Sequence, residues 1–484
     1  MANAPNLLFL CTDQQRTDTL ACYGNSRVQA PYLNALAERS FVFEQAYCTQ
    51  PWCTPSRSSI MTGLFPHTTG CTSNNIALRP ETPTLAELVS DDYDCAYYGK
   101  WHLGNEVIPQ HGFPDWVATQ DLKVREFYSQ PEYREQLSPY HHFLLERGYE
   151  PDVESAGAPV FSQELVHRLP AECTRPAFLA QRAVEFLRRR DTQPWALYVN
   201  FHEPHSPYTG PYNDRHDPAD VEFSPSFLRP LADNVPALMR ERAALLGDQT
   251  LEGRDLTTEA GWRRLIANYW GLVTLIDEAV GDILGALDET GAAGNTVVVF
   301  TSDHGDMMGN HCLHAKHVMY EEAARIPLLL HVPWLDHPTQ LIPGRVSQVD
   351  LVPTLLDLLG QQVPVHLQGE SRVPVLRGER TLAENEVVIE WNDSIEGMPR
   401  ISPNTTADYR RRESAPRRTI IAEDGWKLTL YAMDHGELYD LANDPYELQN
   451  RYDDPAHAGR VRDLAERLVA WQQRTDDTAP LRMP

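Results

Sequence analysis

The sequence is poor in positive charge, and above all in lysine. It has 42 basic residues against 68 acidic ones, a formal net charge of −26. A basic surface for nucleic acid is therefore missing, and attraction to an anionic membrane surface is disfavoured. Only four basic residues are lysines: Lys100, Lys123, Lys316 and Lys427. An acidic protein that binds an anion must gather its cations locally, so each lysine is a candidate for such a site.

Long apolar runs and paired cysteines are also missing. No stretch approaches the roughly 20 apolar residues that a membrane-spanning helix needs. The segment 1–13 lacks the basic start and long apolar core of a secretory signal. The eight cysteines form no CxxC pair, so we expect small buried thiols rather than disulfides. These features predict a soluble, globular, cytoplasmic protein with no nucleic acid and no membrane among its partners.

Apolar runs alternate with amphipathic segments, which predicts an α/β fold. Near-continuous apolar runs, typical of strands buried on both faces, lie at 6–12, 196–201, 296–301 and 327–332. Helices are predicted from Pro31, over about 262–287 and over 348–359. Strands that alternate with helices favour a mainly parallel sheet sandwiched by helices.

The C-terminal part of the chain follows another pattern. Short strand-like segments separated by turns, then a helix over about 455–473, predict a smaller antiparallel α+β subdomain. We place a main α/β domain over 1–369 and this subdomain over 370–484. Two irregular polar segments, 105–175 and 206–260, are expected to be loops and short helices inserted after strands, where α/β folds carry specificity.

Polar side chains follow two of the predicted strands. Asp13 and Gln14 end the first strand, and Asp303 and His304 end the strand at 296–301. Because ligands of open α/β sheets bind at the carboxyl ends of the strands, the two pairs can converge on one cation. Carboxylate and amide oxygens with one imidazole suit Ca²⁺, Mg²⁺ or Mn²⁺. The alternative is an ordinary strand-ending turn at Gly305.

Lysines and histidines in three segments could bind an anion and transfer protons. Lys100 and His102 would face the same way in an extended segment, His205 follows the run at 196–201, and Lys316 comes soon after the second polar pair. A lysine beside an imidazole can neutralise a tetrahedral anion and supply a proton. A zinc site would be the alternative for the residues around Lys316, but their spacing is unusual for one: His311, Cys312, His314 and His317.

Cys53 begins the motif Cys-Thr-Pro-Ser-Arg, which ends at Arg57. A thiol near an arginine, before a helix-like stretch, is well placed for a lowered pKa. A buried cysteine in a capped turn would give the same local pattern. The cysteine and arginine lack the spacing of a cysteine-based phosphatase. With this motif, the chain resembles the type I sulfatases of the alkaline phosphatase superfamily.

The resemblance rests on motifs that stand in the family's order over nearly the whole chain. They are Asp13-Gln14, the Cys-Thr-Pro-Ser-Arg motif with the Ser-Ser-Ile-Met-Thr-Gly that follows it, Gly99–Gly104, Pro204-His205, Thr301–Gly305, Lys316, Tyr320-Glu321, Arg325–Pro327, Glu437–Leu441 and Asn443–Pro445. The Cys-Thr-Pro-Ser-Arg motif is highly specific. The resemblance implies an alkaline-phosphatase-like fold and a metal-dependent hydrolase of aryl or alkyl sulfate monoesters.

The family's chemistry implies a role for each motif residue. A formylglycine-generating enzyme would convert Cys53 to formylglycine, whose hydrated form is the nucleophile. The implied metal ligands are Asp13, Gln14, Cys53 after its conversion, Asp303 and His304. Arg57 would hold the nucleophile, Lys100 and Lys316 would bind sulfate oxygens, His205 would protonate the leaving alcohol and His102 would take the proton whose removal expels sulfate. Asn75 would contact the substrate, with Asn74 as the alternative.

Two positions depart from the commonest sulfatase pattern. Gln14 stands where a second Asp is usual, and His304 where Asn is usual. Ca²⁺ is the family's commonest metal, but both changes strengthen the case for Mn²⁺. The same pairs resemble those of phosphonate monoester hydrolases, so a phosphonate monoester or phosphodiester hydrolase is the alternative function.

A binding protein without activity is a third interpretation. It would have lost at least one of Cys53, Arg57, Asp303 or Lys316, and all four are present. The tail at 476–484 could pack on a second copy of the chain, which would make a homo-oligomer.

Overall fold

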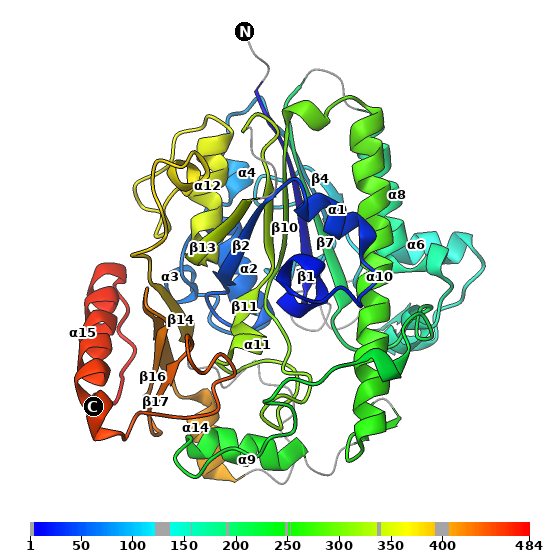
Figure 1. Ribbon diagram of the computed structural model, residues 1–484. Helices are drawn as coiled ribbons and strands as arrows, with labels where there is room; N and C mark the ends of the chain where they lie inside the picture. The colour runs from blue at the N-terminus through cyan, green and yellow to red at the C-terminus, as the bar shows by residue number, and fades with distance from the viewer. Residues whose placement is uncertain are drawn as a thin grey trace.

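The computed structural model describes residues 4–121, 136–155, 157–189, 193–246, 250–251, 253–335, 340–392 and 406–484. Its centre is a nine-stranded sheet with helices on both faces, and a four-stranded antiparallel sheet lies beside it (Figure 1). This is the alkaline-phosphatase-like architecture that the sequence predicts, and its two sheets correspond to the main part and the C-terminal part of the chain.

Five neighbouring strands of the central sheet run parallel. In spatial order they are β10 (Thr296–Ser302), β1 (Asn6–Asp13), β7 (Trp195–Pro204), β3 (Asp94–Gly99) and β4 (Asp115–Val117). Thr12 pairs with Ser302, so Asp13 and Asp303 leave adjacent strands at the same level. The sheet therefore brings the two predicted polar pairs to one edge.

The other side of the sheet is mixed. β12 (Leu328–His331) pairs antiparallel with β10 and with β2 (Phe41–Tyr47). On β2, β11 (Arg325–Ile326) pairs antiparallel and β13 (Gln340–Ser347) parallel. The sequence predicts the strand of β12, but its apolar run carries no information on direction.

The central strands are apolar on both faces because helices cover both. On β1, Leu8 and Leu10 pack into one core, and Leu7 and Phe9 into the other. The first core is covered by α1 (Pro31–Ala37), α8 (Arg175–Arg188) and α10 (Glu259–Glu289). The second is covered by α2 (Cys53–Thr62), α4 (Leu85–Leu88) and α12 (Leu351–Leu358). Among the described residues, no helix combines the length and apolar character needed to cross a membrane.

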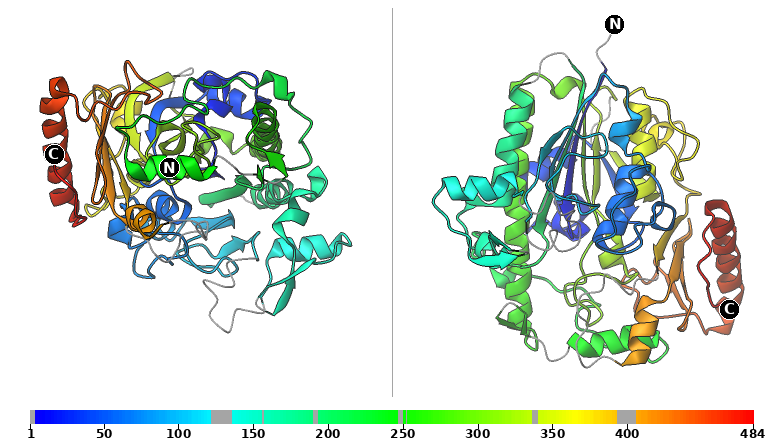
Figure 2. Two further views of the ribbon diagram at one scale, coloured as in Figure 1. Left: turned by 90° about the horizontal axis from the view of Figure 1, so that it is seen from below. Right: turned by 180° about the vertical axis from the view of Figure 1, so that it is seen from behind.

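The C-terminal subdomain packs against one side of the central layers. Its antiparallel strands are β14 (Val387–Trp391), β15 (Arg417–Ile421), β16 (Trp426–Tyr431) and β17 (Glu437–Asp440), with α15 (Ala458–Thr475) on their outer face (Figure 2). The tail after α15 packs on its own subdomain, where Asp477 pairs with Arg418. The predicted boundary at residue 370 precedes β14 and stays a prediction.

The irregular segments contribute short elements, and parts of both lie outside the described residues. Helix α9 (Ala237–Leu246), from the second segment, lies beside α14 (Ala407–Ser414) of the C-terminal part (Figure 1). The remaining helices and strands are α3 (Pro66–Thr69), α6 (Pro139–Glu146), β5 (Val153–Ser155), β6 (Ala158–Val160), α7 (Gln163–His167), β8 (Thr250–Leu251), β9 (Arg254–Asp255), α11 (Glu321–Ala324) and α13 (Val373–Leu376).

Candidate active site

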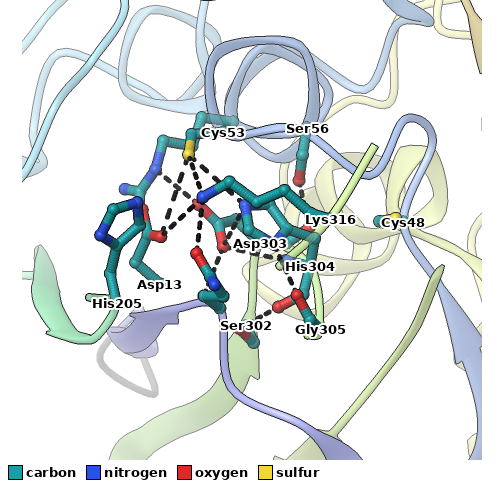
Figure 3. A network of polar contacts seen from close by, with 12 residues as sticks. Asp13, Cys48, Cys53, Ser56, His205, Ser302, Asp303, His304, Gly305 and Lys316 are labelled. Atoms are coloured by element: carbon teal, nitrogen blue, oxygen red, sulfur yellow. Dashed lines mark hydrogen bonds and ion pairs between the residues drawn. The ribbon is translucent and has the colours of Figure 1, made fainter. Parts of the chain in front are cut away.

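The predicted site residues meet where β1, β7 and β10 end and α2 begins. Cys53 is the first residue of α2 and is buried. Its side chain points toward Asp13, Asp303, His304 and Lys316 (Figure 3). Asn74 Oδ1 accepts the Thr54 backbone N–H in the first turn of α2 (2.9 Å), and it thereby satisfies one of the free N–H groups that begin a helix.

Four side chains form a compact set of potential metal ligands. One ligand atom each of Asp13, Cys53, Asp303 and His304 lies within 4.8 Å of the others, and all four residues are buried. Cys53 Sγ lies 3.4 Å from His304 Nε2 and 3.9 Å from Asp13 Oδ1. His304 Nδ1 lies 2.9 Å from the Gly305 carbonyl oxygen. If Nδ1 donates to that carbonyl, Nε2 is left as the ligand atom.

The electrostatics of the two carboxylates also suit a cation. Burial and the neighbouring Asp13 raise the pKa of Asp303 to about 6. Burial opposes the charge of Asp13 as well, but Lys100, His205, Lys316 and Arg57 keep its pKa well below the usual range. A divalent cation between the two groups would remove the repulsion that disfavours a second negative charge.

Gln14 joins this set through its side-chain oxygen. Its Nε2 donates to Asp306 Oδ2 and to the Tyr208 hydroxyl (2.8 Å). With the nitrogen held in this way, Oε1 faces Lys316, whose Nζ donates to it (2.6 Å). The amide oxygen of Gln14, and not its nitrogen, therefore contacts the lysine that also donates to Cys53 Sγ.

Arg57 and Lys100 bind the two carboxylates of the ligand set. Arg57 donates from Nε to Asp303 Oδ2 (3.0 Å) and from Nη2 to Asp13 Oδ2 (3.1 Å). Lys100 Nζ donates to the same Asp13 oxygen (2.6 Å). Both cations are buried. Because the planar guanidinium contacts both carboxylates, it fixes their separation, which a lysine at position 57 could not do.

Lys316 and two histidines surround the sulfur of Cys53. Lys316 Nζ donates to Cys53 Sγ (3.3 Å). Burial lowers the pKa of His102 to about 4 and also lowers that of His205, although a hydrogen bond with Cys53 opposes both shifts. His102 Nε2 lies 3.4 Å from Asn75 Oδ1. Asn75 therefore contacts a candidate catalytic histidine while Asn74 caps the helix, and the expected contact between Asn75 and the substrate stays a prediction.

Sequence reasoning missed the residues that orient Gln14. Asp306 and Tyr208 are fully buried, and both hold its amide nitrogen. Asp306 stands two residues after His304, which is a local signal that could have been used. Tyr208 lies 194 residues from Gln14 in the sequence, and no pattern in the sequence connects them.

Gly305 is required by a close approach rather than by a left-handed turn. A Cβ at this position would lie 2.1 Å from the Glu322 backbone oxygen.

The alternative zinc site around Lys316 does not form: His311 stacks on Tyr320 and His317 packs edge-on against Trp52. Within the described part of the chain, the cluster at Asp13 is the one group of three or more His, Cys, Asp or Glu residues placed to hold a metal.

Comparisons with known proteins show what the chain is similar to. A sulfatase family model matches residues 5–361, and a model of the C-terminal part of N-sulphoglucosamine sulphohydrolase matches residues 309–474. The chain is 25% identical to an N-acetylglucosamine-6-O-sulfatase of Bacteroides thetaiotaomicron and 29% identical to a choline-sulfatase of Rhizobium meliloti (strain 1021), covering 98% of this chain and 88% of each relative. A crystal structure of a phosphonate monoester hydrolase of Agrobacterium radiobacter superposes with a TM-score of 0.75 at 25% identity, covering 97% of this chain and 96% of that one.

Proposed function

Because the chain belongs to the sulfatase family, we propose that it hydrolyses organic sulfate monoesters, aryl or alkyl, through a formylglycine made from Cys53. The observation that carries the proposal is the position of Cys53. Cys53 begins α2 and belongs to the four-residue ligand set, and its Sγ accepts from Lys316 Nζ (3.3 Å). A formylglycine-generating enzyme is the partner that this maturation requires. The cytoplasmic location stays a prediction.

The chain's own residues would divide the chemistry as follows. Lys316 and Lys100 would neutralise the sulfate oxygens, and a hydroxyl of hydrated formylglycine at position 53 would form a new bond to sulfur. The negative charge of the bound ester would favour protonated His205, which would give the alcohol oxygen a proton as its bond to sulfur breaks. His102 would then take a proton from the second hydroxyl, so that sulfate leaves and the aldehyde returns. Water rehydrates the aldehyde, and the net reaction consumes one water.

The donor set fits one divalent cation held by Asp13, Gln14, residue 53, Asp303 and His304. The raised pKa of Asp303 and the short distances between the ligand atoms support this assignment. When bound, such a cation acts as a Lewis acid that lowers the pKa of a bound hydroxyl. We propose Mn²⁺ over the family's commoner Ca²⁺, because one ligand is an imidazole nitrogen and one is an uncharged amide oxygen.

A phosphonate monoester or phosphodiester hydrolase remains the second candidate function. Gln14 and His304 favour it, since they depart from the commonest sulfatase pattern in the direction of that branch. The likeness to the phosphonate monoester hydrolase structure is also consistent with it. Transfer of a phosphoryl or a sulfuryl group needs the same cation, lysines and in-line nucleophile, so the site geometry does not separate them.

Two measurements test the proposal in order. Mass spectrometry of the tryptic peptide that spans residues 40–57 is expected to place the mass change from cysteine to formylglycine on Cys53 and to leave Cys48 unmodified. Rates on sulfate and phosphonate esters of the same phenol then decide between the two functions, with Cys53→Ala as the inactive variant. An unmodified Cys53 in protein produced beside a competent formylglycine-generating enzyme would overturn the nucleophile assignment.

A further inference from the structure

Lys316 lies between two residues whose backbone conformation is energetically unfavourable. The residues on either side, Ala315 and His317, have φ values of +59° and +78°. Residues with a Cβ rarely adopt this left-handed conformation, so the surrounding structure must stabilise it. His317 N donates to the Pro51 carbonyl (3.2 Å), which ties the stretch to the segment before Cys53. The carbonyl oxygens of Lys316 and His317 are held by two arginines.

The first arginine comes from the irregular segment 206–260. Arg242, on α9, donates from Nη2 to the Lys316 carbonyl oxygen (2.8 Å), and the same nitrogen lies 3.0 Å from His317 Nδ1. Its other terminal nitrogen, Nη1, donates to Glu413 Oε1 on α14 (2.8 Å). Arg242 therefore connects the backbone of Lys316 to the contact between α9 and α14.

The second arginine comes from the C-terminal subdomain. Arg417, on β15, donates from Nη2 to the His317 carbonyl oxygen (2.6 Å) and is fully buried. Its guanidinium lies 4.4 Å over the ring of Trp391, and Trp391 stacks on Trp52 at 5.2 Å. Among the described residues, no carboxylate forms an ion pair with Arg417. Its fixed contacts are thus the aromatic face and the backbone beside Lys316.

We infer that Arg242 and Arg417 are positioning residues that hold Lys316 in place. The inference rests on the proposed function for the role of Lys316 itself. The Lys316 side chain reaches Cys53 and Gln14 only while its backbone keeps the strained conformation, and both arginines donate to carbonyl oxygens of that backbone. The segment 206–260 and the C-terminal subdomain are therefore parts of the catalytic unit, although neither carries the nucleophile or a metal ligand.

The scarcity of lysine makes a direct test practical. With ¹³C,¹⁵N-labelled lysine, and with diamagnetic Ca²⁺ in place of paramagnetic Mn²⁺, the side-chain NMR spectrum of the full chain contains four sets of signals, which single Lys→Arg variants assign. Arg242→Met and Arg417→Met are expected to shift the Lys316 signals, and Arg242→Lys to restore them in part. Lys427 pairs with Glu447 of the C-terminal subdomain and with Glu321 of α11, so its signals report whether the subdomain is folded and packed against the main part of the chain.

Arg412→Gln is the matched control. Arg412 pairs with Glu241 (2.7 Å) across the same two helices, and Arg242 is the next residue along α9. The control removes one charge at that interface and is expected to leave the Lys316 signals and the activity unchanged. The Met variants are expected to lose up to about 100-fold in kcat/KM, the size expected of a misplacement of about 1 Å.

Each outcome decides one question. Unchanged Lys316 signals in folded Arg242→Met protein would overturn the inference, and so would equal shifts in the Arg412→Gln control. If Arg417→Met also shifts the Lys427 signals, the substitution has disturbed the subdomain itself. The positioning role is then judged from Arg242→Met alone, because α9 lies outside the subdomain. If the wild-type protein hydrolyses neither ester, the proposed function fails, yet the NMR comparison still establishes or overturns the positioning role.

Discussion

Gln14 offers the sharpest test of the site, because its amide has two tasks. Its nitrogen donates to Asp306 and Tyr208, and its oxygen accepts from Lys316 (2.6 Å). Gln14→Glu keeps the shape and the contact with Lys316. The substitution replaces the amide N–H donor, which contacts Asp306, by a carboxylate oxygen. That oxygen then faces the buried carboxylate of Asp306.

The expected loss follows from these contacts. A hydrogen bond to a charged group contributes about 1.5–3 kcal/mol, and the variant loses the one to Asp306. At about 1.4 kcal/mol for each tenfold change in rate, kcat/KM should fall by roughly 10- to 100-fold. The repulsion between the two carboxylates places the value toward the upper end of that range.

Asp306→Asn supplies the matched second variant. In the double variant Gln14→Glu/Asp306→Asn, the amide introduced at position 306 can donate to the new carboxylate, so we expect this variant to recover most of the lost kcat/KM. The assay is steady-state hydrolysis of an aryl sulfate, with metal content and thermal unfolding measured for every variant. A double variant as slow as the product of the two single losses would refute the reasoning, because the two residues would then act independently.

Three further predictions concern stability, backbone space and the metal. Asp477→Ala should cost about 3–5 kcal/mol in urea unfolding, because it leaves buried Arg418 without its carboxylate. The double variant Asp477→Ala/Arg418→Met should lose less free energy of unfolding, because no buried charge is left unpaired. Arg418 lowers the pKa of Asp477. The higher stability of the wild-type protein relative to Asp477→Ala should therefore be present above about pH 4 and be lost as the pH falls further. Gly305→Ala should abolish activity and lower the thermal midpoint, since its Cβ would meet the Glu322 backbone; an unaffected variant would contradict the close approach. Chelation should remove activity that Mn²⁺ restores better than Ca²⁺, and His304→Asn should reverse this order; an unchanged order would show that the imidazole does not set the preference.

Much of the site could be predicted because its motifs are short and lie at strand ends. The apolar runs at 6–12 and 296–301 predict strands, and polar residues directly after such strands must lie at one sheet edge. Other features could not be predicted. The direction of β12 depends on which strands it joins. Which of Asn74 and Asn75 caps α2 and which contacts His102 depends on the backbone conformation, with a φ of +67° at Asn75.

The sequence by itself determined which chemical groups are available: one candidate nucleophile, Cys53, two polar pairs at strand ends, and few lysines. Local patterns carry that information because each motif is read within a few neighbouring residues. Only the tertiary structure decided how the groups are oriented. Tyr208 turns the amide of Gln14, and Arg417 holds the backbone beside Lys316. These contacts join segments that lie roughly 100 to 300 residues apart, and they form only when the central sheet, the irregular segments and the C-terminal subdomain pack together.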